Sequence, residues 1–339
     1  MMNSKEKYRP WTEREAPKKV LFIRLQAMGD MVITLPYIQG FKKNLPEAQI
    51  DFLTREEFDT VPNSVSLFSN VYTLRGGRST RKQAFCALML ALKLKQVNYD
   101  AVVDLQNNRV SKIIRRLLAP KAWSVFDRWS PIPAGARTEN TIRNIGLGAA
   151  PPDFKFQIKP PESVSLLTGS GWQEGNMLIV LNPAGFLVSR NWPLHNYVEF
   201  GRLILEKYPN AKFLVLGIER INEKAIYLHE QLGESLINLV GKTSPATAFA
   251  IMQHASLVLT EDSGLMHMAW VSGKATVALF GSSRSDWSRP LGSHSICLNS
   301  ADMECGECML SECKFGDVRC LTRFTPKFVF NKAQELLEK

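Results

Sequence analysis

No apolar run in this sequence is long enough to cross a bilayer. A membrane-spanning helix needs about 20 consecutive apolar residues, whereas the longest candidate, Ala84–Leu92, is shorter and is followed by Lys93. The N-terminus also lacks the apolar core of a signal peptide and carries Pro10 and Pro17. We therefore expect residues 1–18 to form a flexible tail and the protein to be cytoplasmic.

Two common nucleotide-binding signatures are missing as well. The segment Gly169-Ser170-Gly171 lacks the third glycine of a dinucleotide fingerprint and does not follow a predicted strand. The pair Gly273-Lys274 has no upstream glycine at P-loop spacing and no following Ser or Thr. Both motifs need the complete pattern to hold phosphates, so the sequence argues against a dehydrogenase and against a P-loop NTPase.

The composition is that of a globular protein with an excess of positive charge. The 339 residues are 45% hydrophobic and 22% charged, and this length can bury two ordinary cores. The net charge is +10 and the isoelectric point is near 9.3. Such a charge favours an anionic partner: nucleic acid, an anionic membrane surface or a phosphorylated small molecule.

Strand and helix signals alternate along the chain. Apolar runs predict strands at residues 20–25, 49–53, 70–74, 101–105, 177–181, 212–216, 236–239, 255–260 and 275–280. Periodic patterns predict helices at residues 30–43, 80–95, 109–118, 195–207, 222–232, 245–254, 265–272 and 326–339. In the helix at 80–95, Phe85, Leu88, Met89 and Leu92 fall on one face. This alternation is typical of α/β proteins with parallel sheets covered on both faces.

A proline-rich segment at residues 151–161 interrupts the alternation and predicts a connector between two domains. The domains would span residues 19–150 and 162–325, the second with a cysteine-rich loop at 305–320. A C-terminal helix at 326–339 would follow. Two such Rossmann-like halves would present their strand ends to a cleft, where ligands commonly bind.

Polar residues follow the first strand of the first half. In Gln26-Ala27-Met28-Gly29-Asp30, Gly29 permits a tight turn and Asp30 begins a helix. Taken alone, Asp30 is more simply a helix cap. At the mouth of a ligand cleft, its carboxylate can also act as a general base.

The second half carries two similar loops. Asn182-Pro183-Ala184-Gly185 follows its first strand, and Arg190 in the same loop can hold a diphosphate through charge-assisted hydrogen bonds. Glu261-Asp262-Ser263-Gly264-Leu265-Met266-His267 lies where a strand ends and a helix begins. The free N–H groups of that first turn suit an anion, and Gly264 lets a phosphate approach. The simpler interpretation is a capped helix and an exposed arginine.

Three stretches resemble the bacterial family-9 glycosyltransferases, the ADP-heptose–lipopolysaccharide heptosyltransferases. They are Ile23–Pro36, Asn182–Gly185 with Arg190–Pro193, and Thr260–His267 continuing to Gly273–Gly281. The resemblance implies a GT-B fold, with the acceptor bound mainly by the first Rossmann-like domain and the nucleotide-sugar donor mainly by the second.

The resemblance also assigns roles to single residues. It implies that Asp30 is the catalytic base and that Arg190 lies near the donor phosphates. Asp262, Ser263, Gly264 and His267 match the donor-binding turn. Glu219 matches a ribose-binding acid, although Glu223 is close enough to leave that assignment open, and Thr243 falls beside the adenine.

These parts fit transfer of a heptose or related sugar from an ADP-sugar donor to a hydroxyl of a lipopolysaccharide core or similar acceptor. A base takes the acceptor proton, while cations and helix N–H groups stabilise the leaving phosphate. The sequence has no Asp-x-Asp metal motif, so transfer should need no cofactor. A GT-B sugar-nucleotide epimerase is the alternative, and a basic nucleic-acid-binding protein with a metal knuckle is a more distant one.

The predicted helix at 109–118 is strongly basic, with Arg109, Lys112, Arg115 and Arg116. Such a run is most simply a solvated face. Its functional interpretation is a site for a phosphate-rich, anionic glycolipid acceptor, or a contact with the inner leaflet at the cytoplasmic face of the inner membrane. The run lacks the aromatic residues that a nucleic-acid site needs, so we expect no nucleic-acid partner.

Four of the six cysteines crowd into one segment: Cys305, Cys308, Cys313 and Cys320. In a cytoplasmic protein, crowding of this kind favours metal over disulfides. The spacing suits a tetrahedral thiolate site for structural Zn or Fe. Reduced structural thiols are the equally simple alternative.

Overall fold

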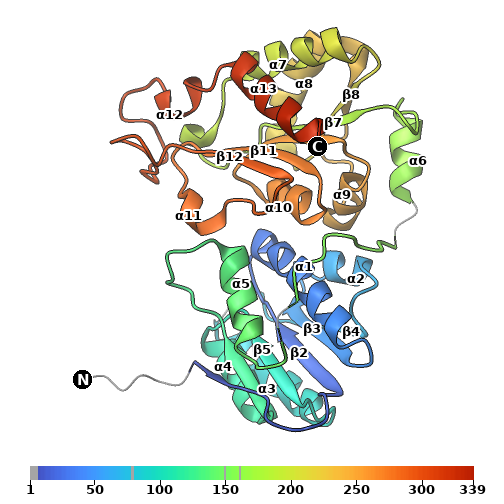
Figure 1. Ribbon diagram of the computed structural model, residues 1–339, viewed down its shortest axis with the longest axis vertical. Helices are drawn as coiled ribbons and strands as arrows, with labels where there is room; N and C mark the ends of the chain where they lie inside the picture. The colour runs from blue at the N-terminus through green and yellow to red at the C-terminus, as the bar shows by residue number, and fades with distance from the viewer. Residues whose placement is uncertain (1–6, 78–79, 149, 160–161) are drawn as a thin grey trace. The chain divides into compact units, whose positions relative to one another are not determined.

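Each half of the chain is built on a six-stranded sheet (Figure 1). The structure is a computed structural model that describes residues 7–77, 80–148, 150–159 and 162–339. The chain divides into two units, Met1–Lys159 and Pro160–Lys339. All paired strands in both sheets are parallel except β1 with β6. The predicted α/β class with two parallel-sheet domains is confirmed.

The sheet of the first unit has the strand order β1-β6-β5-β2-β3-β4. Its strands are β1 (Tyr8–Arg9), β2 (Lys19–Ile23), β3 (Gln49–Arg55), β4 (Asn70–Leu74), β5 (Ala101–Asp104) and β6 (Ala122–Val125). Its helices are α1 (Met28–Asn44), α2 (Thr60–Ser64), α3 (Thr80–Lys95), α4 (Arg109–Leu118) and α5 (Ala134–Arg143). Leu21 packs with α3 and α4, whereas Phe22 packs edge-on against Phe41 of α1. The apolar run of β2 is therefore buried on both faces.

Residues expected in a flexible tail instead extend this sheet. Tyr8 pairs with Ser124 and Arg9 with Trp123, antiparallel to β6. Further along, the Trp11 N–H donates to the Ile145 carbonyl at 2.7 Å. The physical reason is that β6 would otherwise be an edge strand with unpaired N–H and C=O groups. A two-residue strand carries too little periodicity to be detected from sequence.

Much of the predicted connector also lies against the first unit. Asp153 forms an ion pair with Lys43 at 2.7 Å, and Ile158 forms an isolated bridge with Val65. These contacts fix residues 153–158 along the surface of the unit that precedes them.

The second unit has the strand order β12-β11-β10-β7-β8-β9. Its strands are β7 (Leu178–Asn182), β8 (Lys212–Val215), β9 (Leu236–Asn238), β10 (Leu257–Glu261), β11 (Ala275–Leu279) and β12 (Ser295–Leu298). Its helices are α6 (Glu162–Gly169), α7 (Leu194–Lys207), α8 (Asn222–Leu232), α9 (Pro245–Met252), α10 (Gly264–Val271), α11 (Ser285–Ser288), α12 (Arg319–Thr322) and α13 (Pro326–Leu337), with short 3-10 turns at Val188–Arg190, Glu219–Ile221 and Gly233–Ser235.

Helices cover both faces of this second sheet (Figure 1). α7, α8 and α13 share one apolar core with alternate residues of β7, such as Ile179 and Leu181. α9 and α10 contact each other, and Met266 of α10 packs with Phe280 after β11. The C-terminal helix α13 is thus an integral part of the second core.

No helix in the described part of the chain is both long and apolar enough to span a membrane.

Candidate functional site

Each sheet changes winding direction at one place. From β2 the chain adds β3 and β4 on one side and then β5 on the other; from β7 it adds β8 and β9 and then β10. In open parallel sheets, ligands bind beyond the carboxyl ends of the two strands that flank this switch point. The loop with Asp30 follows β2, and the loops with Arg190 and Asp262 follow β7 and β10. The candidate residues thus occupy the expected position within each unit.

Asp30 lies in the first turn of α1 and is only partly exposed. Its Oδ2 accepts the Ala27 N–H at 3.2 Å and lies 2.8 Å from Nη2 of Arg24. Both contacts involve Oδ2, and within the described residues Oδ1 has no hydrogen-bond partner. A general base needs a fixed carboxylate with one oxygen available to the substrate hydroxyl, and Asp30 has this arrangement.

Arg24 fixes the position of the Asp30 carboxylate. Its side chain is 8% exposed, its Nη1 donates to the Leu105 carbonyl, and its guanidinium lies 5.0 Å from the centre of the Phe126 ring. Gln106 fixes the loop itself, because its Oε1 accepts the N–H groups of Leu25 and Gln26, each at 2.9 Å. Sequence reasoning missed both residues; an arginine ending an apolar strand was the available signal.

The turn before α10 is capped by Ser263. Its Oγ accepts the Met266 N–H at 3.4 Å and the Asn182 Nδ2–H at 2.7 Å. The cap therefore ties the carboxyl end of β10 to that of β7. Gly264 is the first residue of α10, and a Cβ placed there would meet no atom within 4 Å. The first turn of α10 is thus open to a ligand, as an anion-binding helix N-terminus requires.

Arg190 and Asp262 come together in the structure. Nη1 of Arg190 lies 3.1 Å from Oδ2 of Asp262, and the two side chains are 16% and 15% exposed. Nε of Arg190 is buried and has no hydrogen-bond partner among the described residues. Asp262 therefore holds the guanidinium of Arg190 just before the first turn of α10.

Glu261 organises the loop after β7 and was given no role by sequence reasoning. Its side chain is fully buried. It accepts the Gly185 N–H at 2.6 Å, the Trp192 N–H at 2.7 Å and the Tyr197 hydroxyl at 3.2 Å. Burial raises the pKa of Glu261 to about 7, against the opposing effects of Lys224 and these hydrogen bonds. A glutamate at the end of an apolar strand was the signal in the sequence.

The remaining donor-site candidates lie at the same edge of the second sheet. His267 is buried, and its Nδ1 accepts the Trp270 indole N–H at 3.2 Å, which places the proton of a neutral ring on Nε2. Glu219 is exposed after β8 and accepts from Nδ2 of Asn222 at 2.9 Å. A Cβ on Gly241 would lie 2.9 Å from Oε2 of Glu219, so Glu219 faces the loop that carries Thr243.

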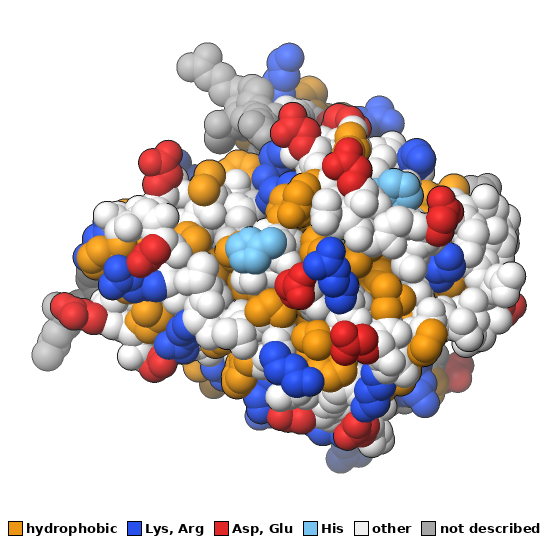
Figure 2. Space-filling view, turned by 90° about the horizontal axis from the view of Figure 1, so that it is seen from above, with side chains coloured by type: hydrophobic (Ala, Val, Ile, Leu, Met, Phe, Trp, Pro, Cys, Tyr) orange, Lys and Arg blue, Asp and Glu red, His pale blue; other side chains and the backbone are white. Residues whose placement is uncertain are grey.

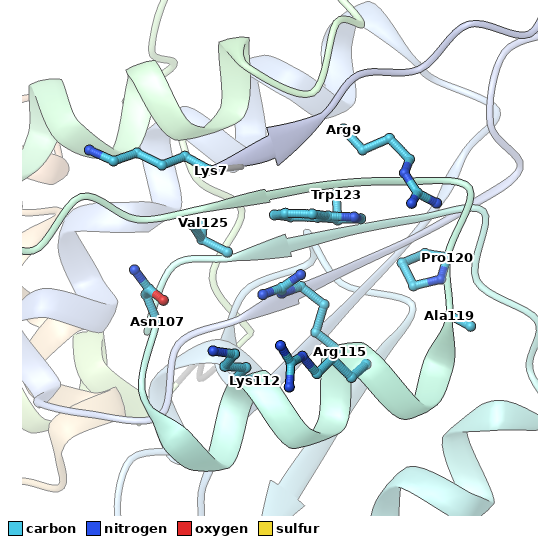
Figure 3. Close-up of a pocket in the computed structure, with 10 residues that line it drawn as sticks. Lys7, Arg9, Asn107, Lys112, Arg115, Ala119, Pro120, Trp123 and Val125 are labelled. Carbon is cyan, nitrogen blue, oxygen red and sulfur yellow. The ribbon is translucent and has the colours of Figure 1, made fainter. Parts of the chain in front are cut away.

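A basic pocket lies between α4 and the β1–β6 edge of the first sheet. Figure 3 shows Lys7, which precedes β1, with Arg9 from β1, Trp123 from β6 and Lys112 and Arg115 from α4 around one space. Its volume is about 720 Å³, and Arg116 also lines it. Arg109, the fourth predicted basic residue of α4, is not among the lining residues.

Arg115 is the anchored member of this pocket. It is 8% exposed, its guanidinium lies 4.1 Å from the centre of the Trp123 ring, and its Nε lies 3.6 Å from Oδ2 of Asp104. Burial lowers the pKa of Arg115, although Asp104 opposes this shift. One cation is therefore fixed in place, whereas Lys112 and Arg116 remain adaptable.

All four clustered cysteines line one cavity of about 250 Å³. Cys320 is buried on α12 and Cys308 is exposed. Partial burial raises the pKa of Cys313, but the backbone N–H groups of residues 315–318 outweigh it and lower the pKa overall. Within the described residues, no three His, Cys, Asp or Glu side chains are grouped closely enough to hold a metal ion. The predicted metal site is thus not shown.

Comparison with known proteins gives consistent matches. The model of glycosyltransferase family 9 (heptosyltransferase) matches residues 136–319, more than half of the chain. Lipooligosaccharide heptosyltransferase 2 of Campylobacter jejuni is 26% identical over 337 residues, covering 94% of this chain and 98% of that protein.

Two solved structures are similar over nearly the full length. A family-9 glycosyl transferase from Veillonella parvula has a TM-score of 0.79 at 20% identity and covers 95% of this chain and 98% of its own. The E. coli ADP-heptose lipopolysaccharide heptosyltransferase II has a TM-score of 0.70 at 18% identity and covers 94% of this chain and 98% of its own. These similarities show the fold, and they agree with the predicted GT-B class.

Proposed function

Because the chain belongs to glycosyltransferase family 9, we propose that this enzyme transfers a heptose from ADP-heptose to a hydroxyl of a lipopolysaccharide core. The main support is the full-length similarity to a lipooligosaccharide heptosyltransferase, which leaves no large part of either chain unmatched. The switch-point positions of the candidate residues in both sheets add a physical argument.

The proposed donor site is the first turn of α10 with Arg190. Departure of a nucleoside diphosphate builds negative charge on the leaving phosphate, and fixed cations and N–H groups stabilise that charge. Arg190 supplies a cation there, and Asp262 keeps its guanidinium oriented before the donor arrives. We assign the donor ribose to Glu219, with Glu223 as the alternative, and the adenine to the loop with Thr243.

Asp30 is the proposed catalytic base. Its free Oδ1 takes the proton from the acceptor hydroxyl. The hydroxyl oxygen then bonds to the anomeric carbon of the sugar, and the bond between that carbon and the diphosphate breaks. Arg24 is a positioning residue, since it binds the other carboxylate oxygen. No step of this scheme needs a metal ion or a cofactor.

The basic pocket is the proposed site for a phosphate of the glycolipid acceptor. Its cations come from two separate segments, residues 7–9 and α4, and surround one space. Charge-assisted hydrogen bonds from several Lys and Arg side chains are the usual means of holding phosphate. An acceptor of this kind would place the enzyme at the cytoplasmic face of the inner membrane.

The donor assignment is tested by calorimetry with ADP, UDP and GDP. We expect ADP to bind, and Gly264→Val to weaken that binding by about 10- to 100-fold, since a side chain would enter the space left for the diphosphate. Gly169→Val is the matched control, because Gly169 is also helical and a Cβ placed on it would likewise meet no atom within 4 Å. It should bind ADP normally.

Tight binding of UDP or GDP without ADP binding would overturn the adenine assignment. Unchanged ADP affinity in a folded Gly264→Val variant would remove α10 from the donor site. Melting temperatures of both variants, compared with wild type, establish that neither substitution unfolds the chain.

We also propose that Cys305, Cys308, Cys313 and Cys320 hold one structural Zn or Fe ion. The observation in favour is that the four thiols line one cavity, and thiolates are the preferred ligands of structural zinc. Purified protein should contain close to one metal ion per chain, and Cys308→Ser should lower stability more than turnover. Metal-free, anaerobically prepared protein with four freely alkylated thiols would contradict this proposal.

A further inference from the structure

Helix α3 buries one face in the core and exposes four large apolar side chains on another. Ala87, Ala91 and Leu94 are fully buried against the sheet and α4. In contrast, Phe85 is 66% exposed, Leu88 43%, Met89 54% and Leu92 51%. These four residues, the α3 stripe, occur at i, i+3, i+4 and i+7 and form one continuous band. A surface helix normally turns such a band toward the core, so the stripe needs another explanation.

Positive charge flanks the α3 stripe on both sides. At 3.6 residues per turn, Lys82 and Lys93 fall beside one edge of the stripe and Lys95 beside the other, and all three are exposed. Ile113 of the neighbouring helix α4 is also 40% exposed. An apolar band bordered by lysines is the pattern of a helix that lies in a membrane interface.

The charge around the stripe has a single sign. Residues 75–99 contain six Lys or Arg and residues 105–122 contain five, and neither segment contains an Asp or Glu. The whole chain has a net charge of only +10. The second unit differs: Figure 2 shows acidic and basic side chains intermixed on the face seen from above. Pairs such as Arg202–Glu199 and Lys332–Glu335 neutralise one another there.

We propose that the α3 stripe docks the enzyme on an anionic lipid bilayer. Its apolar side chains would enter the boundary between headgroups and acyl chains, while the surrounding Lys and Arg bind lipid phosphates. The charge selects this partner over two others. A second copy would bring two strongly cationic faces together, and a nucleic acid would leave the stripe exposed.

Docking on α3 would also explain the position of the basic pocket. Helix α4, which carries Lys112 and Arg116 of the pocket, packs directly against α3. A phosphorylated headgroup held at the bilayer surface would therefore meet the pocket. This consequence rests on the proposed function, whereas membrane binding by α3 does not.

Flotation of the full-length protein with lipid vesicles tests the proposal. Wild type should bind phosphatidylcholine vesicles that contain phosphatidylglycerol, and bind pure phosphatidylcholine only weakly. The double variant Phe85→Ser/Leu92→Ser should lose about tenfold or more of the binding. In the double variant Lys93→Gln/Lys95→Gln, vesicle binding should fall about fivefold per lysine, and only with anionic vesicles. The matched control is Ile226→Ser on α8, which alters a 46% exposed side chain of the second unit.

Two further measurements separate the possible outcomes. Turnover of Phe85→Ser/Leu92→Ser with a water-soluble acceptor that lacks acyl chains should equal that of wild type. If wild type transferred no sugar to this acceptor, the proposed function would be refuted, but the proposal of membrane docking would not be affected. Equal flotation of wild type and the stripe variant would overturn the docking proposal. So would a wild-type dimer that the stripe variant converts to a monomer.

Discussion

The variant Asp30→Asn is expected to turn over about 100- to 10,000-fold more slowly than wild type, the usual cost of losing general-base catalysis. Asparagine has nearly the same shape, and its amide can still accept the Ala27 N–H that caps α1. The ion pair with Arg24 is lost, but the helix and loop should persist. ADP affinity should be unchanged, because Asp30 belongs to the first unit and the donor site to the second. Single-turnover kinetics and calorimetry measure the two quantities separately.

Asp127→Asn is a closely matched control for this variant. Asp127 and Asp30 are both 42% exposed, and each forms an ion pair at 2.8 Å, with Lys7 and Arg24 respectively. Loss of charge and of an ion pair is therefore common to the two variants. Turnover at saturating acceptor should fall only in Asp30→Asn. Equal turnover in both, within a few-fold of wild type, would remove Asp30 from the role of base.

Glu261→Ala should lower the free energy of unfolding by about 3–5 kcal/mol, as expected when a buried charged partner is removed. The substitution leaves the Gly185 and Trp192 N–H groups without their acceptor and Lys224 without its buried counter-charge. Residues 183–192 should become mobile and ADP affinity should fall with them. Denaturant unfolding and hydrogen exchange of this loop provide the readouts.

A surface glutamate in the same unit is the control for Glu261. Glu199 pairs with Arg202 on α7, and both side chains are about half exposed. Exposed ion pairs contribute little to stability, so Glu199→Ala should leave both the unfolding free energy and the exchange of residues 183–192 close to wild type. Similar losses in the two variants would contradict the organising role of Glu261.

The raised pKa of Glu261 also predicts a pH dependence. Burial is the dominant cause, and it moves the pKa from 4.5 to about 7. The folded state therefore holds this proton more tightly than the unfolded state. The contribution of the group to stability is complete below pH 4.5 and is lost as the pH rises through 7. Over this interval wild type should lose up to about 3 kcal/mol relative to Glu261→Gln. A constant difference between the two across pH 4.5–7 would contradict the prediction.

Much of the fold could be predicted from the sequence because buried parallel strands leave a strong local signal. The runs that become β4 and the patterns that become α3, α4 and α8 have the predicted bounds. In contrast, β6 (Ala122–Val125) and α5 (Ala134–Arg143) were missed. β6 has only four residues and alternates between buried and half-buried positions. α5 contains few apolar residues. Neither segment therefore shows a clear hydrophobic periodicity in the sequence.

The positions of the candidate residues could be predicted from the sequence, but the contacts between their side chains could not. Polar residues that directly follow a predicted strand, such as Asp30 and Asp262, can be recognised in the sequence. Their partners are not, since Arg24 reaches Asp30, and Arg190 reaches Asp262, only through tertiary packing. The orientation of α3 is likewise invisible, because the same apolar stripe can face the core or the solvent. The four cysteines line one cavity, while their metal remains a prediction.

The most direct test of the central claim is to incubate the purified enzyme with ADP-heptose and a heptose-free lipopolysaccharide core acceptor in EDTA, and to analyse the products by mass spectrometry. We expect an acceptor that gains one heptose and an equal amount of released ADP, with both products strongly reduced in Asp30→Asn. Release of ADP without a heavier acceptor, or an epimerised donor and no transfer, would contradict it.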